Sequence, residues 1–235
     1  MKTLVSLISF LAILLVALPG PLYKFGILEL GPAFTALRYG VFTGIGAIVL
    51  ILVQLIFLRK NISWPSVAVS AVLAIVAVGL PLSIMSKAKS VPPIHDISTD
   101  LVNPPKFSAI ATLRADAPNP VEYAGEETAK QQREAYPQLK SQVYTQSSAQ
   151  VFGATEAAMN DLGWELVNAD KSAGIIEATD TTTWFGFKDD VIVRIASAQA
   201  GTVLDVRSKS RVGRSDLGKN AERIQQLIEK INSHL

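Results

Sequence analysis

The chain contains no cysteine and only two histidines among its 235 residues. The lack of cysteine excludes disulfide bonds, thiolate metal ligands and a cysteine nucleophile. The formal net charge is only +2, which is too small to indicate a polyanionic partner such as nucleic acid. The sequence also lacks a zinc knuckle, a glycine-rich phosphate loop and the Gly-x-Ser-x-Gly motif of many serine hydrolases. We therefore expect no metal ion and no cofactor.

Charge is also absent from three apolar stretches in the first 86 residues, at 3–18, 39–58 and 64–86. A hydrocarbon core of about 30 Å needs about 20 helical residues, so the second and third stretches predict membrane-spanning helices. A proton or ion pathway normally needs ionisable groups at depth. Their absence from these stretches disfavours a transporter.

The first stretch has two interpretations. Lys2 followed by an apolar block is typical of a signal peptide, but no small-x-small cleavage site follows it, which favours an uncleaved helix. Basic residues, including Arg59 and Lys60 between the second and third stretches, are almost evenly divided between the two sides of the membrane. The signal-like start favours a cytoplasmic N-terminus. We therefore expect a multi-pass protein of the bacterial inner (cell) membrane, with its C-terminal domain in the periplasm.

Small residues recur every four positions in the second and third stretches. They are Gly40 and Gly44 in the second, and Ser66, Ser70 and Ala74 in the third. This spacing lines one helix face with small side chains and allows two backbones to approach closely. It predicts a helical hairpin packed on these faces, although small residues are also simply common in membrane helices.

Residues 1–86 are thus expected to form a three-helix membrane anchor, and residues 87–137 a proline-rich linker. Each proline favours extended geometry in the residue before it. A short helix is expected from about Gly125 to Ala135. The linker is either a spacer or a strap that lies on the following domain, and the alternation of Ile94 and Ile97 with polar residues favours the strap.

Helix-capping residues and the spacing of apolar residues in 138–235 predict an α+β domain. Ser147 and Gln150 form a capping-box pair that begins a helix, and Gly163 ends it. Period-two alternation near residues 191–195 and 204–207 indicates antiparallel strands. Ser215 is expected to cap a final amphipathic helix, with Asp216 in its first turn. The order strand, helix, four strands, helix predicts two helices on one antiparallel sheet, a helix-grip-like arrangement.

Several ordered motifs in the second half carry a family resemblance. They are Pro92–Asp100, Ile176–Asp180, Trp184–Phe187, Asp189–Arg194 and Asp205–Asn220. With them, the chain from about Val91 onward resembles an uncharacterised bacterial and plastid family of membrane proteins, domain of unknown function 1499. The resemblance implies a membrane-tethered domain on the periplasmic side. It implies no established activity and therefore no catalytic residues.

An aromatic turn contains Trp184, Phe185 and Phe187. These rings either cap one end of the sheet or form a surface for lipid headgroups or a partner protein. The three aromatic residues are therefore candidate binding residues, with burial in the core as the alternative.

A second group of candidate binding residues follows Gly201. Alternation places Asp205, Arg207, Lys209 and Arg211 on one strand face, and its three cations, arginine especially, suit phosphate or carboxylate. Hydroxyl groups and a helix N-terminus add further donors, at Ser208, Ser210, Ser215 and Asp216. The alternative is that this face pairs with neighbouring carboxylates, and an ion-pair lattice of this kind would include Asp189, Asp190 and Arg194.

Three functions remain open. The preferred one is a membrane-anchored extracytoplasmic binding or scaffolding domain, which meets the lipid bilayer and an anionic envelope component or protein. The second is a hydrolase-like envelope enzyme using His95, Asp96 and Asp100, although no nucleophile or oxyanion donors accompany them. The third is an accessory subunit of a membrane transport or assembly complex.

Overall fold

The computed structural model describes residues 2–58, 62–199 and 201–235, and it divides into two compact units. The first unit comprises Met1–Lys89 together with Thr183–Gly186, and the second comprises Ser90–Thr182 and Phe187–Leu235. Arg59 and Lys60, the expected basic flank of two spans, lie outside the described residues.

The first unit is helical, and three of its segments are long and apolar enough to cross a membrane, which agrees with the prediction. The third is longer than expected, because its helix continues through Lys87 and Lys89 to Ser90. The helices are α1 (Lys2–Ala17), α2 (Pro19–Lys24), α3 (Leu30–Phe57) and α4 (Trp64–Ser90).

The small residues of α3 contact two different helices. A Cβ atom on Gly44 would lie 2.8 Å from Cγ2 of Val78, so Gly44 faces α4 as predicted. A Cβ atom on Gly40 would instead lie 2.7 Å from Cγ2 of Val16 in α1. The expected hairpin therefore has α1 as a further neighbour, and the prediction that Gly40 packs on the third span was wrong. Ser66 and Ser70 also face α1, since both hydroxyls lie within 3.1 Å of Ser6 Oγ.

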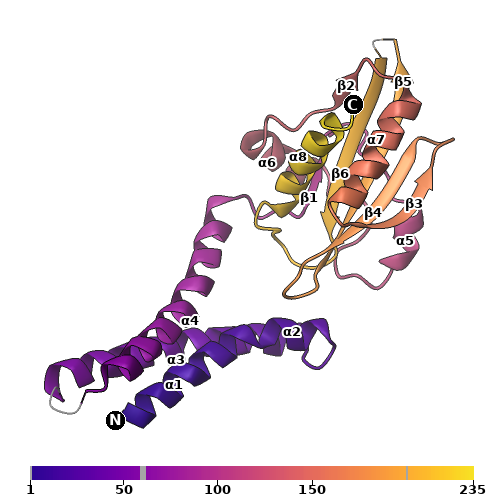
Figure 1. Ribbon diagram of the computed structural model, residues 1–235. Coiled ribbons are helices and arrows are strands. Elements are labelled where there is room, and N and C mark those ends of the chain that lie inside the picture. Colours follow the sequence, from indigo (N-terminus) through magenta and orange to yellow (C-terminus); the bar gives the residue numbers. More distant parts are fainter. Residues whose placement is uncertain (1, 59–61, 200) are drawn as a thin grey trace. The chain divides into compact units, whose positions relative to one another are not determined.

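The second unit is built on an antiparallel sheet in the order β1-β6-β5-β4-β3, with β2 also paired to β6 (Figure 1). The long central hairpin aligns Val193 with Val206. The predicted fold class, apolar helices followed by an antiparallel-sheet domain, is confirmed. The strands are β1 (Asp96–Ser98), β2 (Gln142–Tyr144), β3 (Glu165–Asp170), β4 (Ile175–Thr181), β5 (Lys188–Ala198) and β6 (Gly201–Ser210).

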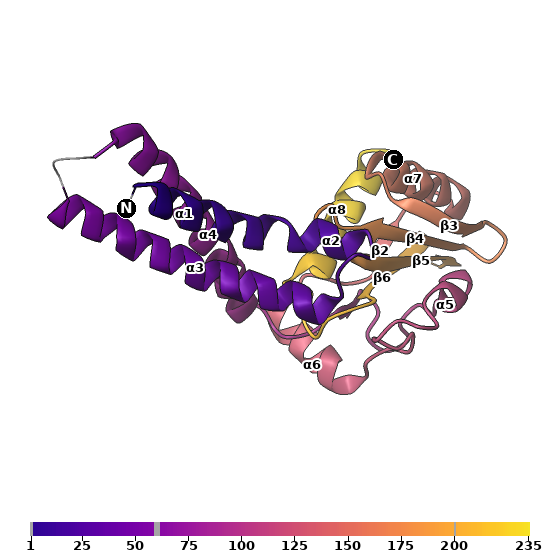
Figure 2. The ribbon, with the colours of Figure 1, turned by 90° about the horizontal axis from the view of Figure 1, so that it is seen from below.

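Helices α7 (Ser148–Asp161) and α8 (Lys219–Asn232) cover one face of this sheet (Figure 2). Their apolar stripes meet the alternating residues of the strands in one core, which contains Met159, Val193 and Ile224. The capping box at Ser147 is present as predicted, because its side chain accepts from the backbone N–H of Gln150. Local capping and apolar periodicity therefore define this layer.

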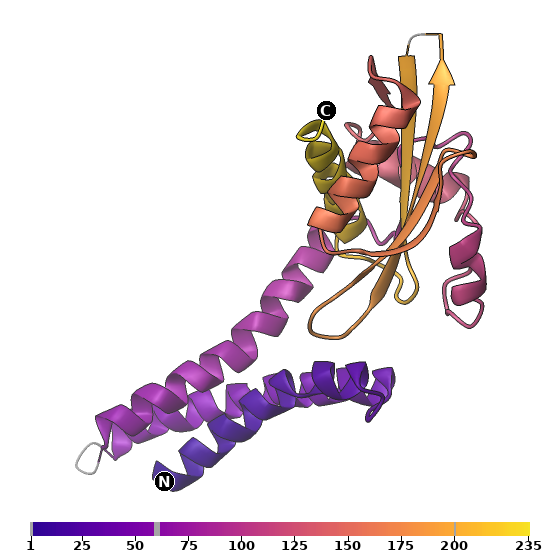
Figure 3. The same cartoon turned by 45° about the vertical axis from the view of Figure 1, so that its right-hand side comes forward.

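The opposite face is covered by part of the expected linker. We call residues 99–124 the strap; it contains α5 (Ala109–Leu113) and precedes α6 (Glu126–Ala135), which agrees with the predicted short helix. Figure 3 shows the strap on the side of the sheet away from α7 and α8. Its apolar contacts with the sheet are few, a cluster of Phe107, Ile110 and Ile192.

The final helix begins later than predicted. Leu217 has φ of 58° and Gly218 has φ of 79°, and two successive left-handed residues interrupt a helix. Ser215 therefore does not cap α8; its hydroxyl accepts from the N–H of Leu217 instead. Gly218 is the N-cap residue, and Asp216, two residues before it, accepts from the N–H groups of Gly218 and Asn220 with its carboxylate.

A glycine pair tests the packing of the first unit. We expect Gly44→Val to lower the free energy of unfolding by about 1–3 kcal/mol, because the added methyl groups meet Val78 and the Ala74 carbonyl. Gly46→Val, two positions further along α3, should have little effect, since nothing lies within 4 Å of its added Cβ. Unfolding of the full chain in mixed SDS micelles, followed by circular dichroism, measures both. Equal loss in the two variants would contradict the packing described here.

Candidate functional site

Strand alternation divides the predicted arginine and serine residues between the two faces of β6. Arg207 and Arg211 lie on the strap face, together with Lys209. Ser208 and Ser210 point to the other face, where they bond to Asn220 of α8. The structure therefore does not bring the arginines and serines together into one anion site.

Asp96 is the centre of the strap face. Its buried carboxylate accepts from Nε and Nη2 of Arg207, both at 2.9 Å, and from Nζ of Lys209 at 2.9 Å. It also accepts from the backbone N–H of Ala124, at the end of the strap. Arg207 and Lys209 are 2% and 1% exposed, so both cations are almost completely shielded from bulk water. Burial lowers the pKa of Lys209, and the neighbouring Asp96 charge opposes that shift.

Arg207 also holds the strap at two places. Its Nη1 donates to the carbonyl of Pro105 at 3.1 Å, and its Nη2 donates to the carbonyl of Val121 at 3.0 Å. These carbonyls belong to two arms of the strap that are far apart in sequence. The planar, fork-shaped guanidinium suits this task, because its donors leave in fixed directions. One arginine thus fixes both arms against the sheet.

A cavity of about 320 Å³ lies between these two arms, with Arg207 in its lining. The guanidinium carbon lies 5.0 Å from the centroid of the Phe107 ring and 5.4 Å from that of Tyr123, within cation–π range. Burial and the Asp96 charge raise the pKa of Tyr123 to about 12, so its phenol stays neutral at physiological pH. The cavity is lined by Pro104, Lys106, Phe107, Val121, Glu122, Tyr123 and Arg207.

A second buried carboxylate lies beside this group on the strap face. Asp190 accepts from Nε and Nη2 of Arg211, both at 2.8 Å, and from the Thr179 hydroxyl. Arg114 of the strap reaches the same carboxylate at 3.2 Å, and burial lowers the pKa of this arginine. The pairs around Asp96 and Asp190 thus hold four cations against two carboxylates.

Glu177 anchors the strap in a different way. Its fully buried carboxylate accepts from the backbone N–H groups of Ser108 and Ala109, both at 2.8 Å, and from the Ser108 hydroxyl at 2.7 Å. It therefore satisfies the N–H groups at the start of α5. Hydrogen bonds of this kind stabilise a buried carboxylate without a cation.

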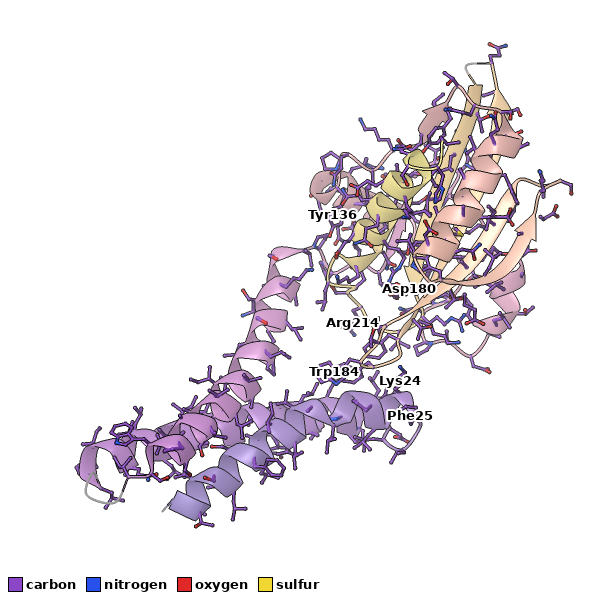
Figure 4. All side chains as sticks on the ribbon, in the orientation of Figure 1. Lys24, Phe25, Tyr136, Asp180, Trp184 and Arg214 are labelled. Carbon is purple, nitrogen blue, oxygen red and sulfur yellow. The ribbon has the colours of Figure 1, made fainter. Side chains whose placement is uncertain are left out.

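The proposed cluster of His95, Asp96 and Asp100 does not form. Asp100 instead bonds to Arg194 at 2.8 Å, and Arg194 also bonds to Asp205 at 2.7 Å. His95 Nδ1 lies 3.4 Å from the carbonyl of Arg214, which Figure 4 labels in the loop before α8. Adjacent strand residues point to opposite faces, which separates His95 from Asp96.

Asp189 also lies on the α8 face. Arg223 of α8 donates to its carboxylate at 2.7 Å and to that of Asp180 at 2.8 Å. The same guanidinium donates to Asn220 Oδ1 at 2.7 Å. These bonds tie α8 to the end of the β4–β5 hairpin.

The aromatic turn divides between the two units. Trp184 and Phe185 belong to the first unit, where Trp184 Nε1 donates to the Ala17 carbonyl at 3.0 Å and the Phe185 ring stacks on Phe34 at 5.8 Å. Phe185 is buried, and Trp184, labelled in Figure 4, is partly buried. Phe187 belongs to the second unit and is also partly buried.

Several residues of this face had not been identified from the sequence. The strap has no regular period that would have placed Phe107 and Tyr123 beside Arg207, or Arg114 beside Asp190. Glu177 could have been noticed, because a charged residue at an inward strand position needs partners. Within the described residues, no group of three His, Asp or Glu side chains could hold a metal ion.

Comparison with known proteins identifies one family. A sequence model described as "Protein of unknown function (DUF1499)" matches residues 96–231. The match begins at Asp96 and includes the whole strap. A search of curated proteins found no match to this chain.

The ion pairs of Asp96 generate a stability prediction. We expect Asp96→Asn to lower the free energy of unfolding by about 3–5 kcal/mol, because Arg207 and Lys209 would remain buried beside a neutral group. Denaturant unfolding of the full chain in detergent, followed by tryptophan fluorescence, provides the measurement.

The matched control is Asp116→Asn, in an exposed part of the strap, which should change stability by less than about 0.5 kcal/mol. A small loss in Asp96→Asn, comparable to that of the control, would show that the strap does not depend on this carboxylate.

Proposed function

We propose that this chain, which belongs to the DUF1499 family of proteins of unknown function, is a membrane-anchored binding protein whose ligand site is the cavity beside Arg207. The observation that carries the proposal is the cavity of about 320 Å³ between two arms of the strap that Arg207 holds in place. Small-molecule sites begin near this volume and are mostly apolar with a few fixed polar groups.

The chemistry of the strap face favours binding over catalysis. A catalytic carboxylate must reach the proton that it transfers, but Asp96 and Asp190 are buried and already accept several hydrogen bonds each, most of them from arginine and lysine. His95, the histidine of the enzyme hypothesis, makes its contact with the Arg214 carbonyl in the loop before α8, and no hydrogen bond to Asp96 or Asp100 is found in the described residues. An arrangement that is already satisfied and rigid is suited to recognition, because little has to be ordered when a ligand arrives.

A fragment screen tests the cavity. Fluorine NMR of small fluorinated fragments would be recorded with the full chain in phosphatidylcholine nanodiscs. We expect some fragments to bind the parent protein but not Val121→Trp, because the indole fills the cavity that Val121 lines.

The matched control is Val143→Trp, which places the same indole at an exposed position of β2 away from the cavity. It should bind fragments as the parent does. Thermal melts establish that both variants fold. If no fragment distinguishes Val121→Trp from Val143→Trp, the cavity is not a ligand site.

We also propose that the anchor lies in the bacterial inner membrane, with the second unit in the periplasm. Three candidate spans support the multi-pass anchor, and the signal-like start supports this orientation.

Because the chain lacks cysteine, single cysteines report the orientation directly. We expect a membrane-impermeant maleimide to label Lys219→Cys in intact spheroplasts. It should label Ser63→Cys, between α3 and α4, only after permeabilisation. The reverse pattern would place the second unit in the cytoplasm.

A further inference from the structure

The cavity beside Arg207 has a chemical character that narrows its ligand, provided that the proposed binding function is correct. Its walls are largely apolar, because Pro104, Phe107, Val121 and the ring of Tyr123 line it. Two of these are flat rings that also contact the Arg207 guanidinium. A flat, apolar body fits such walls better than a hydrated sugar or a bare inorganic ion.

Arg207, which lines this cavity, belongs to a group of buried cations on the strap face. The pairs around Asp96 and Asp190 contain four cations and two carboxylates, and Glu177 adds a third buried carboxylate on the same face, which leaves a surplus of one positive charge when all are ionised. This surplus acts at short range, because Arg207 itself lines the cavity. A buried surplus of one sign favours a ligand of the opposite sign.

Two cationic groups of the lining keep donors for that ligand. Nη1 of Arg207 carries two hydrogens, of which one bonds to the Pro105 carbonyl, and the other has no acceptor within the described residues. Lys106 is exposed in the cavity lining, and the described part of the chain offers its ammonium group no hydrogen bond or ion pair. Both groups suit an oxyanion.

The carboxylate of Glu122 disfavours ligands with more than one negative charge. Glu122 also lines the cavity and is exposed, and no cation pairs with its side chain in the described residues. It would repel a doubly charged phosphate more strongly than a singly charged carboxylate. The lining therefore favours a monoanion.

We infer that the cavity beside Arg207 binds a small monocarboxylate with a flat apolar body, whose carboxylate meets Lys106 and the remaining N–H of Arg207. The apolar body lies against Phe107, Val121 and Tyr123.

Three probes of similar size test the class of ligand: 4-fluorophenylacetate, its neutral amide and the cation 4-fluorobenzylamine. Fluorine relaxation would be measured with the full chain in phosphatidylcholine nanodiscs, with empty nanodiscs as the blank. The anion should bind most tightly and the cation most weakly.

Two neutralising substitutions on the cavity lining should change affinity in opposite directions. Lys106→Gln should weaken binding of the anion by about twofold to fivefold, and Glu122→Gln should tighten it by a similar factor. Both side chains are exposed, so neither substitution disturbs the core, and this pair remains informative if Val121→Trp fails to fold.

The results separate this inference from the binding function on which it rests. Preference for the anion, with opposite shifts in the two variants, supports the inference. Equal binding of all three probes, preference for the amine, or no response to either substitution overturns it, even if other fragments still distinguish Val121→Trp from Val143→Trp. Failure of that earlier comparison overturns the binding function itself.

Discussion

Both arms of the strap are joined to the sheet by a buried interaction, that of Asp96 with Arg207 and Lys209. Burying three charged groups is costly unless the geometry is good and their remaining donors are satisfied. Here Asp96 receives two parallel bonds from Arg207, one from Lys209 and one from the Ala124 backbone. The same two cations donate to carbonyls of Pro105, Val121 and Glu122. The interaction therefore joins β1, β6 and both arms of the strap.

The two faces of the sheet are stabilised by different forces. The face under α7 and α8 is apolar and follows the hydrophobic effect, with side chains such as Val193 and Leu227 fully buried. The face under the strap has a small apolar cluster and relies on charged hydrogen bonds. Such bonds are directional, so they fix the position of a segment that has little regular structure. A cavity between arms held in this way is preformed, so the proposed binding would need little further ordering of the strap.

Sequence periodicity predicted the elements that are stabilised locally. The apolar spans, the capping box at Ser147 and the alternating strands β5 and β6 all follow from spacing along the chain. The start of α8 was misplaced because Leu217 adopts a positive φ, which its residue type does not indicate. The partners of Arg207 could not be predicted, because Asp96 lies 111 positions away and no local pattern relates the two. The separation of the serines from the arginines could have been predicted, because the same period-two alternation that aligns Arg207 with Arg211 puts Ser208 on the opposite face.

The central claim is that the fork of Arg207, and not its charge alone, holds the strap over the sheet. Hydrogen–deuterium exchange of the full chain and of Arg207→Lys tests this most directly, because lysine keeps the charge but cannot bond to both arms. The account predicts faster exchange in residues 99–124, with unchanged protection in α7 and α8. Unchanged exchange in the strap, or a uniform increase across the second unit, would contradict it.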